Sequence, residues 1–368
     1  MKNLFVSLSI ILFIFACKNK TEQNKKPFSL LNTPVEKFAD SVIIDFSAAD
    51  TILLETNKQS VFNYESAQFK FTSEYIFIFD NNPLFSTQLI KVFNWQGKYI
   101  GSIGNIGQGP GEFTSALNFM VDDAKQEVYI NTGHKLIVYN YKGDYLRTIK
   151  YPSYIGLYSY ELPGGGFISF SPHPVNNQLL NKFDFNGKHT DSLFSIPQNY
   201  YPYASPICSK NSNRLYVIPL WYDEIYSIND KNQITREFDF NIEDEFLIRH
   251  ISLNEDNMLS AFLSSDYYGP FQKLHVSDDS IFLTEIRKNR DTYQVFGDLS
   301  TRKIRVRELT FETNFNTIVG TYNNKSISYT SLAQFKDVDG NYMYKPDPNH
   351  NGCLLLFTIK KSFLNKTE

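Results

Sequence analysis

Hydrophobic positions recur along the chain as an apolar strand, a turn centred on glycine and a second strand. The unit is clearest in Leu89–Ile100 (LIKVFNWQGKYI), Lys135–Leu146 (KLIVYNYKGDYL) and Leu180–His189 (LNKFDFNGKH). The turn glycines of these copies are 46 and 44 residues apart (Gly97, Gly143 and Gly187). Glycine and asparagine tolerate the positive φ that a tight hairpin requires. Each copy is therefore predicted to form a β-hairpin.

Weaker copies follow at Glu224–Ile234 and Tyr293–Val306, and a last strand is predicted at Cys353–Ile359. A further strand precedes each full unit, and these strands are Tyr75–Asp80, Glu127–Asn131, Gly166–Phe170, Arg214–Ile218 and Ser280–Thr284. Strand, loop, strand, glycine turn and strand, at a period near 45 residues, is typical of propeller blades. The pattern predicts an all-β fold, a six-bladed β-propeller of four-stranded antiparallel blades.

The last unit has few strand-like residues after Ile359, whereas Ser41–Phe46 and Thr51–Leu54 precede the first full unit. An N-terminal strand that completes the C-terminal blade hides strand edges that would otherwise invite aggregation. We therefore expect residues 41–55 to pair with the blade that contains Cys353–Ile359. Residues 241–262 carry a helix-like pattern and predict a short helical or irregular insertion. Residues 336–352 are rich in turn formers and predict a long loop.

Composition supports a folded β-protein and argues against one class of partner. Hydrophobic residues make up 42% of the chain, aromatic residues 16% and charged residues 20%. This composition is globular, and aromatic residues suit a pleated, half-buried surface. The formal net charge is −3. We expect no nucleic-acid partner, because neutralising phosphates requires a basic face.

The N-terminus reads as a targeting segment. Lys2 is followed by an apolar stretch of 13 residues from Leu4 to Ala16, and then by Cys17. A bilayer-spanning helix needs about 20 residues, so this length fits a signal peptide. The run Ile14–Cys17 (IFAC) resembles a bacterial lipobox, in which the cysteine becomes the lipidated first residue after cleavage. The rival interpretations are a secretory signal cut elsewhere and an uncleaved anchor.

The expected organisation has three parts: a signal peptide over 1–16, the lipidated Cys17 with a flexible tether to 35, and the propeller over 36–368. The polar run Lys18–Pro27 has no hydrophobic periodicity and suits a solvated tether. Cys208 and Cys353 remain beyond the anchor. They either pair, because exported proteins meet an oxidising compartment, or stay as two buried thiols.

One motif carries a family resemblance. Gly107–Phe113 (GQGPGEF) resembles the loop that ends the first full blade in NHL-type six-bladed β-propeller lipoproteins of Gram-negative, Bacteroidetes-like cell envelopes. The Val35–Glu55 region, with its Leu53-Leu54-Glu55, is similar to their N-terminal segment, and the resemblance covers most of residues 35–360. The resemblance implies a membrane-anchored location, on the periplasmic face or the cell surface, and the propeller architecture. It implies no particular chemistry.

Candidate binding residues fall into two groups. The first is the glycine-rich loop, whose amides can cradle an anion; the alternative is a blade-to-blade crossover that needs positive φ at several glycines, with the Glu112 side chain capping backbone amides. The second is a series of loop aromatics that can stack on sugars or peptides, or simply pack between blades. The candidates are Gly107, Gln108, Gly109, Pro110, Gly111 and Glu112, and then Tyr201, Trp221, Tyr222, Tyr267 and Tyr268.

Other polar residues suggest structural roles. The histidines show no metal-ligand spacing, and no pair of cysteines has zinc-site spacing. The carboxylate pairs Asp122-Asp123 and Asp278-Asp279 stand just before strands, where turns use aspartate to bond their own backbone.

Two functions follow from the sequence. The first is a non-enzymatic binding or scaffold module of the cell envelope, without a cofactor, whose axial face holds a peptide, glycan or protein partner. The alternative is a metal-dependent hydrolase or lyase, lactonase-like, with a divalent metal in the central channel; this rests on analogy between folds.

Overall fold

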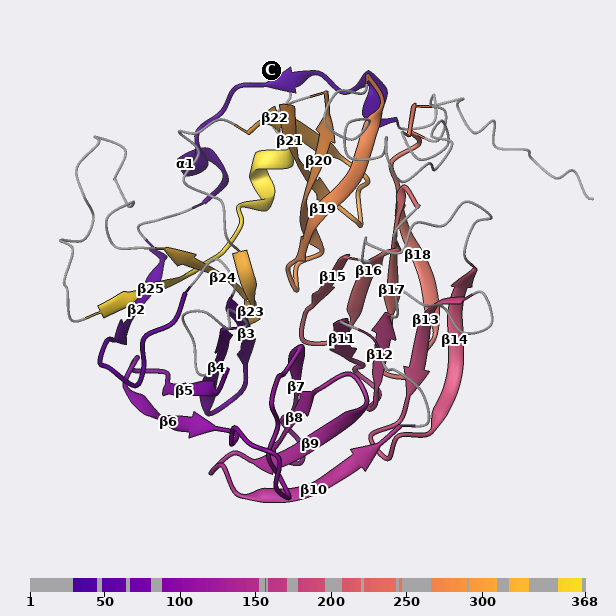
Figure 1. Cartoon of the computed structure of the whole chain (residues 1–368). Coiled ribbons are helices and arrows are strands. Elements are labelled where there is room, and N and C mark those ends of the chain that lie inside the picture. Colours follow the sequence, from indigo (N-terminus) through magenta and orange to yellow (C-terminus); the bar gives the residue numbers. More distant parts are fainter. Residues whose placement is uncertain are drawn as a thin grey trace, which may run out of the picture.

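The chain folds into a ring of six β-sheets, as seen in the computed structural model (Figure 1). The all-β, six-bladed propeller predicted from the repeats is confirmed. The structure describes residues 29–44, 48–63, 67–80, 88–151, 156, 158–170, 178–195, 207–219, 222–242, 245–246, 266–289, 291–309, 318–330 and 350–365.

The first four blades are antiparallel meanders of four strands each, with the innermost strand first in the chain. Blade 1 is β3 (Ala67–Phe71), β4 (Tyr75–Asp80), β5 (Ile90–Asn94) and β6 (Tyr99–Ile103). Blade 2 is β7 (Asn118–Asp122), β8 (Glu127–Asn131), β9 (Lys135–Asn140) and β10 (Tyr145–Lys150). Blade 3 is β11 (Tyr158–Glu161), β12 (Phe167–Phe170), β13 (Gln178–Phe183) and β14 (His189–Ser195). Blade 4 is β15 (Ile207–Lys210), β16 (Leu215–Ile218), β17 (Glu224–Ile228) and β18 (Ile234–Asp239).

The last two blades recruit strands from the N-terminal segment. Blade 5 is β19 (Tyr268–Val276), β20 (Ile281–Lys288), β21 (Asp291–Asp298) and β22 (Ile304–Glu308), with β1 (Val35–Glu36) added at its outer edge. Blade 6 is β23 (Ile318–Tyr322), β24 (Lys325–Thr330), β25 (His350–Phe357) and, outermost, β2 (Asp50–Glu55). The short helices are η1 (Leu30–Asn32), α1 (Asp40–Ile43) and η6 (Lys361–Asn365).

The core lies between neighbouring blades. Strands such as β12 are buried along their whole length, because both faces of an inner strand pack against an adjacent sheet. Phe79 of blade 1 and Phe119 of blade 2, for example, meet edge to face with ring centroids 5.9 Å apart. This explains why the sequence shows short continuous apolar runs at these strands rather than alternation.

The ring closes as the sequence predicted. β2 pairs antiparallel with β25, with Leu53 opposite Cys353. The hairpin turn of blade 1 packs closely against this strand. Gly97 in the turn has φ +79°, and a side chain there would clash, because a Cβ atom would lie 1.8 Å from the carbonyl oxygen of Leu53. The Gly97 carbonyl accepts a hydrogen bond from the amide of Glu55 at 2.9 Å. The seam between the last and first blades is therefore tied by backbone contacts.

The strand expected at Ser41–Phe46 is wrong in its first part. Residues Asp40–Ile43 form α1, and Ile44 then makes an isolated bridge to Ile359. Ile43 and Ile44 are both fully buried, which consecutive residues on a strand with one exposed face cannot achieve. The helical turn directs both side chains into the same core cluster.

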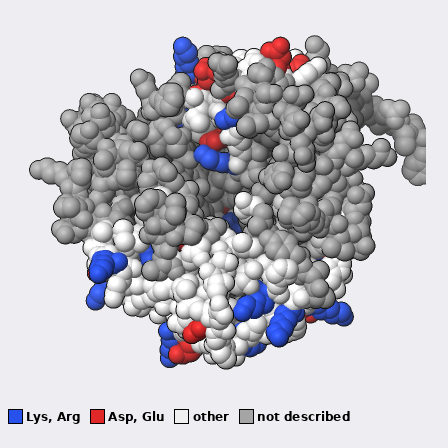
Figure 2. All heavy atoms as spheres, viewed as in Figure 1, with Lys and Arg blue, Asp and Glu red and all other residues white. Residues whose placement is uncertain are grey.

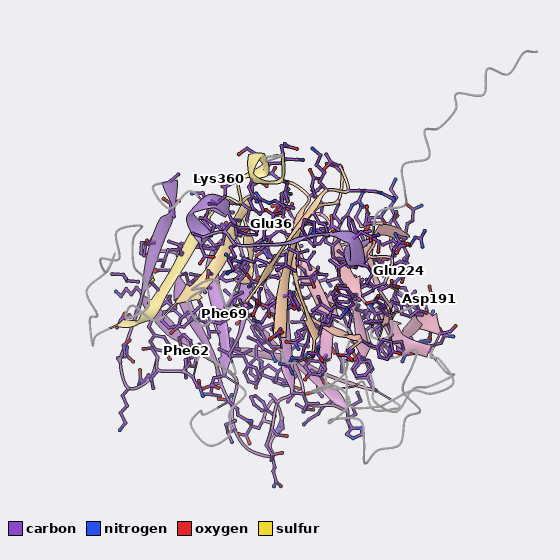
Figure 3. The ribbon with its side chains drawn as sticks, turned by 90° about the horizontal axis from the view of Figure 1, so that it is seen from above. Glu36, Phe62, Phe69, Asp191, Glu224 and Lys360 are labelled. Atoms are coloured by element: carbon purple, nitrogen blue, oxygen red, sulfur yellow. The ribbon has the colours of Figure 1, made fainter. Side chains whose placement is uncertain are left out.

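Blade 5 departs from the expected set of four antiparallel strands. β1 adds a fifth strand, parallel to β22, with Val35 opposite Val306. Upstream of it, the amide of Leu30 donates to the carbonyl of Phe240 at 2.9 Å, and the Leu30 side chain is buried. Contacts with the propeller thus begin before residue 36, where the sequence placed the boundary. Figure 3 shows Glu36 and Lys360 on the same side of the ring, where both ends of the chain cover blades 5 and 6.

The structure also describes part of the two segments that break the repeat, and both cysteines of the propeller. Most of 241–262 and 336–349 lies outside the described residues, but His350–Gly352, which we expected to be loop, begins β25 because it pairs with the end of β2. Cys208 and Cys353 are both free; Cys353 is buried, as the two-thiol alternative required, whereas Cys208 is only half-buried. No helix in the described part of the chain is long and apolar enough to span a membrane.

Candidate functional site

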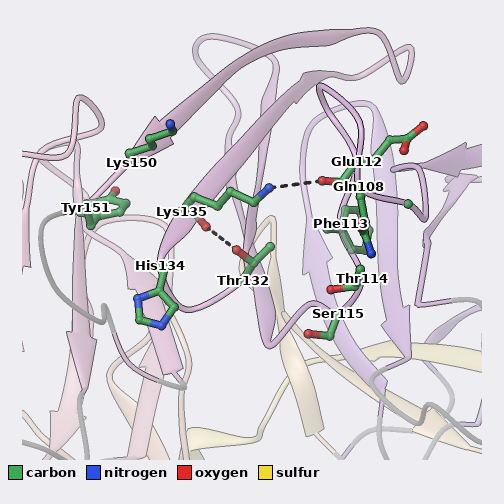
Figure 4. A pocket seen from close by; sticks show the side chains of 11 residues that line it. Gln108, Glu112, Phe113, Thr114, Ser115, Thr132, His134, Lys135, Lys150 and Tyr151 are labelled. Carbon is green, nitrogen blue, oxygen red and sulfur yellow. Dashed lines mark hydrogen bonds between the residues drawn. The ribbon is translucent and has the colours of Figure 1, made fainter.

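A cleft of about 640 Å³ lies at the edge of blade 2. Three segments that are distant in sequence form its walls (Figure 4): the crossover from blade 1 to blade 2 over residues 107–115, the turn between β8 and β9, and the end of β10. β6, β8 and β10 all finish at this end of the blades, so the propeller topology brings the three segments together. The volume is within the range of about 300–1,000 Å³ that small-molecule sites occupy.

The crossover is held against blade 2 by hydrogen bonding and packing. Gly111 has φ +77°, and a Cβ atom there would lie 2.7 Å from the ring of Tyr145. Its carbonyl accepts a hydrogen bond from the hydroxyl of Tyr139. Phe113 is 2% exposed and anchors the loop in the core between blades 1 and 2. The loop therefore presents a fixed wall to the cleft.

The carboxylate of Glu112 belongs to the loop itself. Its Oε2 accepts a hydrogen bond from the amide of Gly109 at 2.8 Å, and a Cβ atom on Gly107 would lie 2.0 Å from the same oxygen. The structural alternative for this motif, a crossover capped by Glu112, is thus confirmed. Figure 4 shows the carboxylate turned away from the lysines of the cleft, so it does not neutralise them.

Two lysines form the opposite wall. Lys135 begins β9 and Lys150 ends β10, and the antiparallel register places them directly opposite each other. A bulge between Tyr145 and Arg147 sets this register; without it, Ile149 would stand opposite Lys135. Like charges in directly opposed positions are destabilising, since their Cβ atoms are about 5 Å apart. Among the described residues, neither lysine has a carboxylate within ion-pair distance.

Lys135 reaches across the cleft. Its Nζ donates to the backbone oxygen of Glu112 at 3.4 Å, and Figure 4 shows the Lys135 side chain extending to the crossover, with Lys150 at the far wall. A long contact to a neutral carbonyl leaves the positive charge uncompensated. Both ammonium groups therefore remain able to take an anion.

Uncharged polar groups line the rest of the cleft. Thr132 donates its hydroxyl to the carbonyl of Lys135 at 3.1 Å, and this bond holds the turn. Gln108, Thr114, Ser115 and His134 complete the polar lining. Hydroxyl, amide and imidazole groups offer both donors and acceptors.

Tyr151 lines the cleft beside Lys150 (Figure 4). Its side chain is 8% exposed and packs edge to face against Phe183, with the ring centroids 5.4 Å apart. Burial raises the pKa of the Tyr151 hydroxyl, so the phenol stays neutral. This residue contributes shape to the site rather than charge.

Among the predicted aromatic residues that the structure describes, Tyr222 and Tyr268 belong to different clusters. Tyr222 packs edge to face against Phe194 and Tyr226, inside the cluster between blades 3 and 4. Tyr268 packs on another cluster, under the ammonium of Lys288, and Tyr267 is 38% exposed. Tyr201, Trp221 and Cys17 lie outside the described residues.

The sequence did not identify the lysines or His134 as site residues. His134 and Lys135 open a repeat unit, and Lys150 closes the same unit, so their positions fit an ordinary blade. The only feature of the sequence that pointed to this site was the glycine-rich crossover facing these residues.

Asp122 bonds the backbone of its own turn, as expected, whereas Asp123 and Asp278 contact neighbouring blades. Asp122 accepts from the amide of Lys125 at 3.2 Å. Asp123 accepts from the amide of Ser73 in blade 1, and Asp278 of blade 5 accepts from Ser212 in blade 4. Asp123 and Asp278 therefore join neighbouring blades.

Side chains of the described inner strands bridge the central channel. Lys70 of β3 reaches Glu161 of β11 at 2.8 Å, and the other oxygen of Glu161 accepts from the amide of Val121 in β7. Although burial opposes ionisation, Lys70 and Lys210 hold the pKa of Glu161 below its ordinary value. Within the described residues, no three His, Cys, Asp or Glu side chains gather as a metal site would require. The hydrolase or lyase alternative has no supporting geometry in that part of the chain.

Comparison with known proteins gives one family and a set of related folds. Residues 37–356 match the family described as "Domain of unknown function (DUF4934)". A Bacteroides fragilis protein described as exported aligns with a TM-score of 0.67 and 18% identity, over 87% of this chain and 97% of that chain. A member of the DUF4221 family from Bacteroides vulgatus aligns with a TM-score of 0.54 and 10% identity, over 86% and 98%. No curated protein matches this chain significantly. At these identities, the structural likeness demonstrates the fold alone.

Proposed function

We propose that this chain, which belongs to the DUF4934 family, is a lipid-anchored binding protein of the bacterial cell envelope that holds an anionic ligand in the cleft of blade 2. The lipobox-like run before Cys17 supports the anchor. The description of the Bacteroides fragilis neighbour as exported agrees with an envelope location. The ligand and the anchor use different parts of the molecule.

One observation carries the binding proposal. Lys135 and Lys150 are paired across neighbouring strands at the wall of a cleft, without a carboxylate partner among the described residues. Such a pair costs stability in the empty protein. An anion bound between the two ammonium groups would offset this repulsion. The nearby carboxylate of Glu112 does not fill that role, because it already accepts a hydrogen bond from the Gly109 amide.

The ring also separates the tether from the cleft. The N-terminal segment docks at Leu30, beside Phe240 at the junction of blades 4 and 5, whereas the cleft belongs to blade 2. In a ring of six blades, blade 2 lies opposite blade 5 (Figure 1). Figure 2 shows Lys and Arg side chains around the lower rim of the molecule, in the region of blades 1–3.

The anchor predicts one result in a Gram-negative host. The full chain should incorporate an alkyne-tagged fatty acid and partition into the detergent phase, because acylation at Cys17 adds buried methylene groups worth about 0.8 kcal/mol each. The Cys17→Ser variant should lose the label and shift to the aqueous phase. Cys208→Ser serves as the matched control, since that thiol lies within blade 4. A labelled Cys17→Ser variant, or an unlabelled wild type, would contradict the lipid anchor.

The cleft predicts a second result. In affinity electrophoresis through dextran sulfate, the double variant Lys135→Gln/Lys150→Gln should bind about tenfold more weakly than wild type, which corresponds to about 1.4 kcal/mol. The control is Lys142→Gln/Lys188→Gln, which removes the same charge from two exposed lysines in hairpin turns at the other end of the blades. Neutral dextran should retard none of the proteins. Equal losses in the two double variants would mean that binding follows net charge, and the cleft would have no role.

A further inference from the structure

We infer that the cleft of blade 2 recognises an anionic oligosaccharide, a chain of sugar rings that carries carboxylate or sulfate groups. This inference rests on the proposed function and names the class of ligand. It follows from the juxtaposition of paired lysines with a wall of uncharged hydroxyl and amide groups.

The size of the cleft argues against a lone inorganic anion. A volume of about 640 Å³ far exceeds the roughly 30 Å³ that one water molecule occupies in the liquid, so phosphate or sulfate would fill only a small part of it. The lysine wall and the polar wall are also formed by different segments. A ligand that contacts both must combine a charged group with an extended polar body.

The polar lining fits ring hydroxyls. Gln108, Thr114 and Ser115 stand on the crossover, and Thr132 stands in the facing turn. Each of these side chains can donate and accept, and a sugar hydroxyl does the same. Thr114 and Ser115 are exposed, as is Lys150 at the far wall, so the cleft is open at its rim and a longer chain can continue out of it.

A peptide suits this lining less well. The aromatic residues of the cleft are Phe113, which is 2% exposed, and Tyr151, which is 8% exposed. They present little apolar surface, whereas peptide recognition relies on pockets that bury side chains. The lining also lacks arginine, the side chain that grips a single planar anion in a bidentate manner. Lysines act as point charges and tolerate anions at varied positions on a sugar ring.

Isothermal titration of the full chain in mild detergent tests the inference with five probes: trigalacturonic acid, a sulfated trisaccharide, a neutral galactose trisaccharide, triglutamate and inorganic phosphate. At least one anionic trisaccharide should bind about 30-fold more tightly than the neutral one. Comparing the carboxylated and sulfated arms identifies the anionic group. Gln108→Ala/Ser115→Ala should weaken that sugar about fivefold, and Lys135→Gln/Lys150→Gln about tenfold.

The outcomes separate this inference from the proposed function. If triglutamate or phosphate binds as tightly as the anionic sugars, is weakened by the lysine variant and ignores Gln108→Ala/Ser115→Ala, the anion site stands and the sugar assignment is overturned. If no anionic probe responds to the lysine variant, both fail. Circular dichroism of each variant, compared with Lys142→Gln/Lys188→Gln, confirms that the propeller is intact before titration.

Discussion

Replacement of Arg307 by methionine is expected to lower the free energy of unfolding by about 3–5 kcal/mol, the cost of breaking a buried ion pair from one side. The Arg307 side chain is only 2% exposed, and its Nη2 lies 2.6 Å from Oδ1 of Asp40 in α1. Methionine fills much of the volume but leaves the carboxylate of Asp40 without its partner. The N-terminal segment would then lose the ion pair that joins α1 to blade 5.

Arg307 also ends a polar network that crosses blade 5. Its guanidinium donates to Oε1 of Gln294 at 2.8 and 2.9 Å and to the carbonyl of Phe38 at 3.1 Å. Gln294 in turn donates to Glu285, which pairs with Lys273 on the innermost strand. Removing the arginine therefore leaves several buried acceptors unsatisfied, and each unsatisfied group adds about 1–3 kcal/mol.

Urea denaturation followed by circular dichroism measures the effect on the full chain. The matched control is Arg236→Met, because the Arg236 side chain is 56% exposed and lies 3.6 and 3.3 Å from Glu224 and Asp239. Exposed pairs of this kind contribute about 0–1 kcal/mol. A loss below about 1 kcal/mol for Arg307→Met, similar to the control, would show that the N-terminal segment adds little to the stability of the ring.

The blades could be predicted because local chemistry dictates them. Turn residues such as Gly97 and Gly143, both with positive φ, specify hairpins at fixed intervals, and the apolar strands before them supply the second strand of each blade. Ring closure was predictable by counting strands, because the last blade lacked one strand and an extra strand was predicted near the N-terminus. Both arguments need only short-range patterns.

The N-terminal segment could not be predicted in the same way. Arg305 and Arg307 alternate with apolar residues in β22 and look like a solvent-facing row. Arg307 is buried and Arg305 half-buried because residues 35–40 fold over them, where Glu36 pairs with Arg305 and Asp40 with Arg307. These ion pairs join residues more than 260 positions apart, so no local sequence pattern predicts them.

Only one wall of the candidate site could be predicted, because the other wall depends on how the strands pair. The crossover was visible because seven consecutive residues, Gly107–Phe113, include three glycines. The facing lysines were not visible, since their opposition depends on a bulge in β10. A shift of one residue moves a side chain to the other face of a strand, so the cationic wall exists only in the folded register.

The two ends of the chain stabilise each other as well as the ring. Phe38 lies between Phe296 of blade 5 and Phe363 of η6, with ring centroids at 5.8 and 5.0 Å. The guanidinium of Arg305 stacks over Phe38 and Phe363. Loss of either terminus would expose the same aromatic cluster, which explains why the Arg307 substitution should have a larger effect than one surface contact would.

The stability of the propeller is expected to fall in mild acid because of one buried histidine. His275 on β19 is 5% exposed, and its Nε2 lies 2.8 Å from the hydroxyl oxygen of Ser326 on β24. Burial lowers the pKa of His275 to about 3, and Asp278 opposes this only weakly. In the unfolded chain the same imidazole has a pKa of about 6.5. Between these values the unfolded chain binds one more proton than the native protein, so stability falls as the pH falls from about 6.5 toward 3.

The size of this effect follows from the two pKa values. At pH 4.5 the His275 contribution is about 2.7 kcal/mol less favourable than at pH 7.5. His275→Gln keeps a polar atom near the position of Nε2 and cannot titrate. Between pH 7.5 and pH 4.5 its free energy of unfolding should therefore fall by about 2.7 kcal/mol less than that of the wild type. His189→Gln, at an exposed site on β14, should retain the full change of the wild type. Urea denaturation at both pH values gives each difference within one protein, which cancels any constant cost of the substitution. Equal pH dependence in wild type and His275→Gln would show that the buried imidazole does not control the acid stability of the seam between blades 5 and 6.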